Sequence, residues 1–298
     1  MFGFLNCNKP AGMTSRDVVN IVANRIAPYK AGHAGTLDPL AEGVLVLGVG
    51  RASRLVSYVQ DYEKQYAATF RLGVASASGD LEQELIEYPE DPVPTFEELT
   101  LAAQTLTGEI EQTPSAFSAI WVDGKRAYER VRNGETVEMP SRRVLIHALT
   151  LTRYEYPWMD LEIICGSGTY IRSLGVDLAA TVNTHAVMSH LCRTRIGPFA
   201  ISASVEALSL KNTPIQPWVQ PATMGVEHLP KMQLDGTLMW RVGNGLCVDA
   251  ETHPSVHPNQ GGVVAAIAPD GRLHAILRGK TKQGNPAWYP EKVFHVES

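Results

Sequence analysis

The sequence predicts an α+β fold, because strand-like and helix-like segments both occur and do not alternate regularly along the chain. With 298 residues, of which 44% are hydrophobic, the chain can bury a substantial core and has room for one large domain and a small one. Apolar residues at helical spacing predict helices over 14–26, 95–110 and 169–182. Apolar or alternating runs predict strands over 43–50, 64–73 and within 147–168.

Local signals support the first of these elements. A Thr–Ser cap at 14–15 precedes apolar residues at helical spacing, and Pro28 closes the segment. The run GVLVLGVG at 43–50, valine- and leucine-rich between glycines, is typical of a buried strand. The loop that carries Asp38 is therefore expected between a helix and a core strand.

A change in character near residue 211 predicts a second unit. Four prolines fall between 209 and 230, which favours a linker, placed at 211–227. Beyond it, short β-like runs and a Pro–Asp–Gly turn predict a compact β module over 228–298. Residues 1–210 then form the larger domain.

The formal net charge of −5 is distributed unevenly. Ten acidic residues and no Lys or Arg lie between Leu72 and Gln112, so the rest of the chain is basic, with 26 Lys and Arg against 21 acids. A polyanion could dock on the basic part, although a solvated surface of mixed charge explains the composition as well.

Cysteine spacing and hydropathy exclude several classes of protein. The four cysteines form no CxxC pair, which favours reduced thiols over a disulfide framework or a zinc site. No apolar run is long enough to cross a bilayer, and the N-terminus lacks a signal-peptide pattern. We expect a cytoplasmic protein.

One carboxylate, Asp38, stands in the otherwise uncharged stretch GHAGTLDPLA, which also holds His33. A loop side chain held by a rigid strand suits catalysis. An Asp before Pro is also a common turn former, so the residues alone leave both interpretations open.

The chain has no complete dinucleotide fingerprint, Walker motif or GxSxG elbow. A proline interrupts the HPSVH spacing, which argues against two metal-binding histidines on one face of a helix.

Six blocks, in order, resemble the bacterial TruB family of tRNA pseudouridine synthases. They are NKPAGMTSRDVV, GHAGTLDPLAEGVLVLGVGRASRLV, KQYAATFRLG, SAFSAIWVDGKRAYERVRNGE, CGSGTYIRSLGVDLA and LCRTRIGPF. The resemblance implies a catalytic domain with a mixed central sheet, followed by a PUA-like RNA-binding module. It implies isomerisation of uridine to pseudouridine at position 55, in the TΨC loop of tRNA, without cofactor or metal. It further implies a tRNA stem-loop as partner, no membrane, no obligatory protein partner and a monomer.

The resemblance also assigns catalytic roles. Asp38 matches the family's catalytic aspartate, which attacks the ribose or removes a proton from it as the uracil leaves. Tyr66 matches the tyrosine that stacks on the target base and is placed to take the C5 proton. Arg172 matches the arginine that pairs with the aspartate, and a guanidinium fork is well suited to orient a carboxylate.

Further residues are expected to bind or support the RNA. His33 matches a histidine that packs among the loop bases, Lys9 belongs to a supporting motif, and Tyr170 precedes Arg172 in GTYIR. An RNA-gripping insertion is expected at about 117–145. It contains a cluster of basic residues, which are Lys125, Arg126, Arg130 and Arg132. The same cluster is also compatible with an amphipathic helix that has a solvated basic face.

The chain departs from the family pattern after the strand at 64–73. The family often carries a Thr- and Asp-rich turn there, whereas this chain reads VASASGDLEQE, followed by the acidic stretch. Two rival functions from other classes are considered. They are a non-catalytic RNA-binding or tRNA-folding protein on the same scaffold, and a carboxylate glycosidase, which needs a second acid nearby. A related class, the guide-RNA-dependent pseudouridine synthases, shares the LDP block, but the run LAEGVLVLGVGRAS resembles the stand-alone bacterial form.

Overall fold

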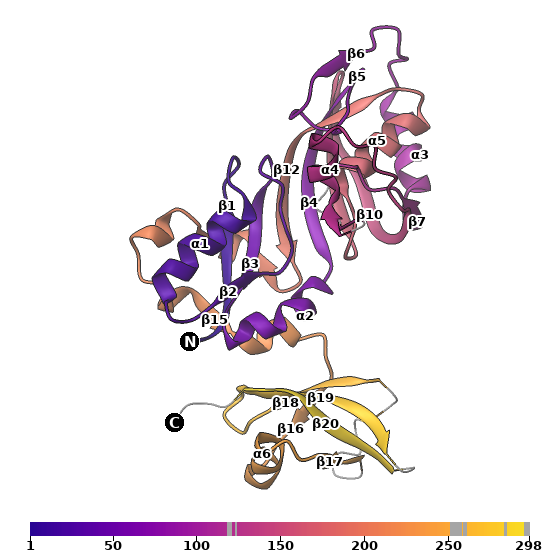
Figure 1. The fold of residues 1–298 in the computed structure, drawn as a ribbon. Coiled ribbons are helices and arrows are strands. Elements are labelled where there is room, and N and C mark those ends of the chain that lie inside the picture. The colour runs from indigo at the N-terminus through magenta and orange to yellow at the C-terminus, as the bar shows by residue number, and fades with distance from the viewer. Residues whose placement is uncertain (118–120, 123, 251–257, 259–260, 283–284, 295–298) are drawn as a thin grey trace.

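A computed structural model describes the chain except for residues 118–120, 123, 251–257, 259–260, 283–284 and 295–298 (Figure 1). It contains a large sheet of 11 strands and a separate sheet of 5 strands near the C-terminus. Helices pack beside the strands without regular alternation, which confirms the α+β prediction. Within the described part of the chain, no helix is both long and apolar enough to span a bilayer.

The large sheet is mixed, as predicted. Its strands are β1 (Phe2–Lys9), β2 (Ala31–His33), β3 (Glu42–Gly50), β4 (Lys64–Leu72), β7 (Gly108–Gln112), β10 (Arg142–Glu155), β11 (Trp158–Cys165), β12 (Ala186–Ile196), β13 (Phe199–Ala200), β14 (Val205–Glu206) and β15 (Val219–Pro221). The main order is β14-β1-β3-β12-β4-β11-β10-β7, with β2, β13 and β15 attached to it. The pairs β1–β14 and β3–β12 are parallel, and the other pairs in this sheet are antiparallel.

Helices cover each half of the sheet. They are α1 (Ser15–Ile26), α2 (Val56–Gln60), α3 (Phe96–Thr105), α4 (Ala127–Arg132) and α5 (Ile171–Thr181), with 3-10 turns η1 (Arg51–Leu55), η2 (Ile201–Ala203), η3 (Ser209–Lys211), η4 (Gln216–Trp218) and η5 (Ala222–Val226). Thr14 and Asp17 form a capping box that starts α1 at its predicted position. The helix predicted over 95–110 ends earlier, because Gly108 has a φ of 102° and begins β7.

Two small hairpins extend from the sheet. They are β5 (Val74–Ser76) with β6 (Leu85–Glu87), and β8 (Trp121–Val122) with β9 (Lys125–Arg126). The first hairpin falls where the sequence departs from the family pattern. The second falls in the expected insertion at 117–145.

The two halves of the large sheet meet along a narrow seam. Strands β3 and β12 pair only at Cys192–Glu42 and Arg193–Gly43, whereas β1 and β3 pair along their whole length. Gly43 has a φ of 98°, and a Cβ there would lie 2.3 Å from the carbonyl oxygen of Arg193, so glycine permits this approach. Figure 1 shows the halves diverging from the seam. The loop 34–41, which leads into β3, lies at this seam.

The C-terminal sheet forms its own layer. It contains β16 (Lys231–Gln233), β17 (Val248–Asp249), β18 (Val263–Ile267), β19 (Leu273–Lys282) and β20 (Asn285–Val293), in the order β16-β18-β19-β20-β17, with helix α6 (Gly236–Gly243) beside it. Residues 211–227, expected as a linker, carry η4, β15 and η5, and β15 pairs antiparallel with β1. This segment therefore packs against the large sheet on its way to the C-terminal module.

Candidate active site

The Asp38 loop is fixed by contacts to the N-terminal segment. The Ser15 hydroxyl accepts a hydrogen bond from the Leu37 amide at 2.8 Å and lies 3.1 Å from the Leu37 carbonyl oxygen, to which it can donate. The Lys9 ammonium, fully buried, donates to the carbonyl oxygens of Pro10, Met13 and Pro39. These bonds hold the backbone on both sides of Asp38, so its carboxylate leaves a constrained loop.

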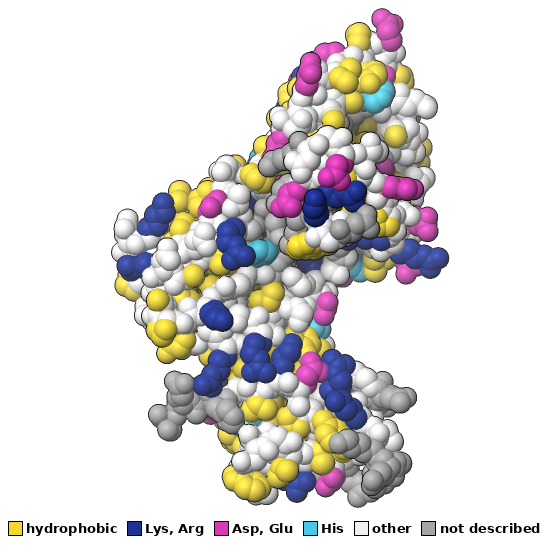
Figure 2. Space-filling view, in the orientation of Figure 1, with side chains coloured by type: hydrophobic (Ala, Val, Ile, Leu, Met, Phe, Trp, Pro, Cys, Tyr) yellow, Lys and Arg dark blue, Asp and Glu magenta, His cyan; other side chains and the backbone are white. Residues whose placement is uncertain are grey.

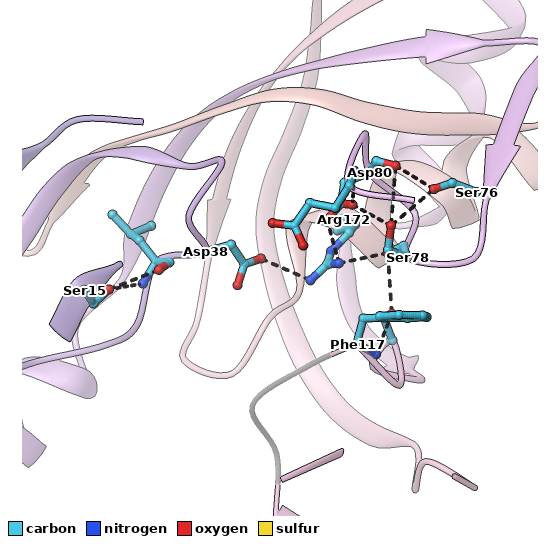
Figure 3. Close-up of polar contacts among 10 residues, drawn as sticks. Ser15, Asp38, Ser76, Ser78, Asp80, Phe117 and Arg172 are labelled. Carbon is cyan, nitrogen blue, oxygen red and sulfur yellow. Dashed lines mark hydrogen bonds and ion pairs between the residues drawn. The ribbon is translucent and has the colours of Figure 1, made fainter. Parts of the chain in front are cut away.

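Arg172 lies between two carboxylates at the start of α5 (Figure 3). Its Nη2 atom is 3.1 Å from Oδ2 of Asp38, and its Nη1 atom is 2.7 Å from Oδ2 of Asp80. The Asp38 side chain is 44% exposed, whereas that of Asp80 is 2% exposed. A substrate can therefore reach Asp38 but not Asp80.

Asp80 is itself held by a tight turn. The Ser78 hydroxyl donates to its Oδ1 at 2.5 Å, and the Glu82 amide donates to the same oxygen at 3.0 Å. Arg172 also donates to the Ser78 carbonyl oxygen at 2.9 Å. The turn between β5 and β6 thus fixes the guanidinium from the side away from Asp38, as Figure 3 shows.

Asp38 and Arg172 line a cavity of about 490 Å³, together with Tyr66 from β4 and Tyr170. Four of the sequence-predicted site residues therefore meet at one place, although they come from distant parts of the chain. Lys64 and Arg193 line the same cavity. Arg193 donates from Nε to the carbonyl oxygen of Val44 and from Nη2 to that of Gly35, which ties β12 to the loop and to β3.

Tyr170 is clamped in position. Its backbone amide donates to Oε1 of Gln112 at 2.7 Å, and Nε2 of Gln112 donates back to the Tyr170 carbonyl oxygen at 3.0 Å. The guanidinium carbon of Arg142 lies 4.6 Å from the centre of the Tyr170 ring. Because α5 begins at the next residue, these contacts also fix the start of the helix that carries Arg172.

Burial changes the acid–base properties of several groups around the cavity. It lowers the pKa of Lys9 and the pKa of Lys64 to about 8 each. It raises the pKa of the Tyr66 phenol, an effect that the positive charge of Arg193 opposes. It lowers the pKa of His33, with smaller contributions from the charges of Arg16 and Arg193. Burial therefore weakens the charged forms of these groups, although a lysine with a pKa of about 8 still carries its proton at pH 7. Two carboxylates line the cavity, those of Asp38 and the exposed Asp61.

His33 and Lys9 flank the cavity without lining it. His33 is half-buried on β2, and its Nδ1 atom has no hydrogen-bond partner among the described residues. Lys9 supports the Asp38 loop through its hydrogen bond to the Pro39 carbonyl oxygen. His33 precedes the cavity residue Ala34 in the chain, and Pro39 is the residue after Asp38.

The expected basic insertion is only partly described. Lys125 is exposed on β9, and Arg130 on α4 forms an ion pair with Glu135 at 2.7 Å. The side chains of Arg126 and Arg132 lie outside the described part of the structure. At the start of the insertion, the Ser115 hydroxyl lies 3.5 Å from the Ser78 carbonyl oxygen and accepts a hydrogen bond from the Phe117 amide. The insertion thus begins beside the turn that holds Arg172.

Sequence reasoning did not identify Asp80, Gln112, Lys64 or Arg193 as parts of the site. Asp80 and Gln112 belong to the acidic stretch, which suggested only a solvated surface. Lys64 does give a signal, because it lies two residues before Tyr66 on the same face of a strand. Arg193 lies within the block LCRTRIGPF, which suggested no role for it.

Comparisons with known proteins find similar sequences along most of the chain. The family model described as "TruB family pseudouridylate synthase (N terminal domain)" matches residues 23–171. The chain is 38% identical to tRNA pseudouridine synthase B of Rhodopirellula baltica, covering 98% of this chain and 94% of that protein. It is 35% identical to the protein of the same name from Moorella thermoacetica, covering 99% of each.

A solved structure shares the fold. The match is to a chain from a crystal structure of a Cbf5-Nop10-Gar1 complex, with a TM-score of 0.77 and 24% identity. The match covers 99% of this chain and 85% of the other. At this identity the likeness concerns the fold alone.

Proposed function

Because the chain belongs to the TruB family of pseudouridylate synthases, we propose that it isomerises a uridine of tRNA to pseudouridine. The finer assignment is uridine 55 in the TΨC loop, which follows from the sequence blocks that resemble the family. The observation that carries the proposal is the accessible Asp38 carboxylate, held by Arg172 at the edge of a cavity that Tyr66 also lines.

The reaction exchanges one bond of the nucleoside for another. The bond between N1 of uracil and C1′ of ribose breaks, C5 of the rotated base bonds to C1′, the C5 proton leaves and N1 gains a proton. Asp38 is placed to attack the ribose or to remove a proton from it as the base departs. Arg172 fixes the direction of that carboxylate, and Asp80 fixes Arg172.

The base must leave its stack before this chemistry can occur. A cavity of about 490 Å³ is within the size range of small-molecule sites, roughly 300–1,000 Å³, and can admit one nucleoside. The Tyr66 ring offers a surface on which the extruded uracil can stack. Its oxygen is the candidate acceptor of the C5 proton.

The remaining residues support RNA binding. His33, which precedes the cavity residue Ala34 in the chain, is assigned to packing among the loop bases, and Lys9 holds the Asp38 loop. Tyr170 lines the cavity, and the basic residues of the insertion are suited to phosphate contacts. We propose that the chain acts alone, as a monomer, in the cytoplasm.

Mapping the modified uridine tests this proposal. A tRNA transcript is incubated with the purified chain alone, labelled with a carbodiimide that persists on pseudouridine, and read by primer extension. We expect one new stop at the TΨC-loop uridine, and no stop when that uridine is replaced by cytidine. A tRNA that binds without any stop would indicate a non-catalytic RNA-binding protein, and product only after addition of a guide RNA would indicate the guide-dependent class.

A further inference from the structure

A second cavity, of about 590 Å³, includes Arg172 among its lining residues but not Asp38, Tyr66 or Tyr170. We call it the rear cavity. Its walls are the turn between β5 and β6, the helix α5, the residues just before β12, and the segment 113–116 at the start of the insertion. Ser78, which Figure 3 shows beside Arg172, belongs to the first of these walls. The rear cavity is therefore a separate space from the one assigned to the nucleoside.

One carboxylate in the rear cavity lacks a partner. Asp177 of α5 lines the cavity, and its carboxylate forms no hydrogen bond or ion pair with the residues that the structure describes. The side chain is half-buried, and this burial raises the pKa of the Asp177 carboxyl. A carboxylate that is partly removed from water without a partner carries a desolvation cost. A cation bound in the cavity would offset that cost.

The position of Asp177 along α5 adds to the demand for a cation. The helix ends at Thr181, about one turn after Asp177, and its last turn contains no basic residue. The C-terminal end of a helix carries a partial negative charge, which favours cations and disfavours carboxylates near it. The helix and the carboxylate therefore attract positive charge to the same wall of the cavity.

The surroundings of the rear cavity leave this attraction largely uncompensated. Among the described lining residues, Arg172 is the only Lys or Arg, and it already binds Asp38 and Asp80. His185 also lines the cavity, and its Nδ1 atom lies 2.8 Å from Oδ2 of Asp91. Figure 2 shows Asp and Glu side chains at the end of the molecule that carries β5 and β6, whereas Lys and Arg lie mainly farther down the view. The cavity thus suits a positively charged ligand.

The other lining residues indicate which kind of cation fits. Hydroxyl groups of serines and threonines in the walls can accept hydrogen bonds from an ammonium group. Small apolar side chains offer contacts for a short hydrocarbon chain, and they are Ala75, Ala77, Ala116, Val176, Ala180 and Ala186. Within the described part of the chain, no group of three or more His, Cys, Asp or Glu residues is arranged to hold a metal ion. The lining therefore favours an organic cation over a metal.

We propose that the rear cavity binds a free aliphatic amine, with its ammonium group against the Asp177 carboxylate and its methylene groups against the alanines. The inference goes beyond the proposed function and does not depend on it, because the nucleoside occupies a different cavity. A bound amine would touch the turn that holds Arg172. The cavity thus provides a place where a small cation stabilises the support of the active-site arginine.

The test measures the binding of 1-aminobutane to the full chain by isothermal titration calorimetry, near neutral pH and at constant ionic strength. The uncharged probe 1-butanol has the same chain length. Asp177→Asn removes the carboxylate, and Ala180→Leu narrows the cavity while keeping that charge. The matched control is Asp249→Asn, at an exposed position on β17 outside the cavity. Thermal melting without ligand establishes that all the proteins are folded.

We expect wild type and Asp249→Asn to bind 1-aminobutane with a dissociation constant of about 1 mM or lower. The Asp177→Asn and Ala180→Leu proteins should bind it at least about tenfold more weakly, as should wild type with 1-butanol. No binding by the wild type at roughly 10 mM amine, or equal affinities for wild type and Asp177→Asn, would overturn the inference. Unchanged affinity in Ala180→Leu would also overturn it, because the amine would then pair with Asp177 outside the cavity.

Discussion

Nη2 of Arg172 lies 3.1 Å from Oδ2 of Asp38, although 134 residues separate the two in the sequence. The same guanidinium binds Asp80 through Nη1, so one buried cation is shared by an accessible carboxylate and a buried one. The buried partner fixes the arginine, and the arginine in turn fixes the accessible carboxylate. This relay of contacts makes the orientation of Asp38 depend on a turn between β5 and β6.

Replacement of the buried partner should disturb that relay. We expect Asp80→Asn to lower kcat by about 100-fold, because Arg172 loses the charge that holds it and a displacement of about 1 Å at a reacting group has effects of this size. The dissociation constant for tRNA should change less than about threefold, since Asp80 is buried. Asp177→Asn, on the same helix but not in contact with Arg172, is the matched control. Equal kcat values for Asp80→Asn and wild type would show that Asp80 is not needed to position Arg172 and Asp38.

The two roles of Tyr66 can be separated by substitution. Tyr66→Phe keeps the ring and loses the oxygen, so we expect kcat to fall by about 100-fold or more with little change in KM. Tyr66→Leu also loses the stacking surface, and KM should rise by roughly tenfold as well. Because burial raises the pKa of the Tyr66 phenol, its anionic form is scarce at pH 7, and single-turnover product formation should increase with pH in the wild type. A Tyr66→Phe protein with wild-type kcat would exclude the oxygen as the proton acceptor.

The buried Lys9 predicts a pH dependence of stability. Burial lowers its pKa to about 8 in the folded chain, from 10.5, so the unfolded chain binds more protons between these values. The free energy of unfolding contributed by this group therefore rises with pH across that window. We subtract the free energy of unfolding of Lys9→Met from that of the wild type. We expect this difference to become more positive by about 2–3 kcal/mol between pH 7.5 and pH 10.

Urea unfolding at a series of pH values measures this difference. Lys211→Met, which removes an exposed ammonium, controls for the change in net charge. A difference between wild type and Lys9→Met that stays flat over the window would show that the ammonium of Lys9 is not desolvated.

Helix α5 packs against β4 through a position that only glycine can fill. A Cβ at Gly175 would lie 2.0 Å from Cε1 of Phe70, whose ring is fully buried. We expect Gly175→Ala to destabilise the protein by about 1–3 kcal/mol, although alanine favours helix formation by about 1 kcal/mol relative to glycine. Thermal unfolding measures the effect, and Gly236→Ala, at a helical glycine with open space, is the control. A stabilised Gly175→Ala protein would contradict the packing described here.

Local sequence signals predicted much of the fold. The cap at Thr14 and the apolar spacing after it placed α1, and the valine-rich run placed β3, because those signals act within a few residues. The end of α3 was predicted too far along the chain, since Gly108 starts a strand that only its pairing with β10 makes evident. The packing of residues 219–221 against β1 likewise depends on a partner more than 200 residues away.

The candidate site likewise contains some residues that the sequence could predict and others that it could not. Asp38, Tyr66 and Arg172 were identified because their sequence blocks resemble a family, and the structure brings them to one cavity. Asp80 was not, because its role arises from burial beneath Arg172, and spacing along the chain does not encode that contact. Gln112 clamps Tyr170 across 58 residues, which is equally invisible in the sequence.

The most direct measurement of the central claim is tritium release from a tRNA transcript labelled at C5 of uridine, with wild type compared to Asp38→Asn. The C5 hydrogen leaves only if the base rejoins the ribose through that carbon. We predict release by the wild type and none by Asp38→Asn, while both proteins bind tRNA with similar affinity. Release by the Asp38→Asn protein at the wild-type rate would contradict the assignment of Asp38 as the reacting group.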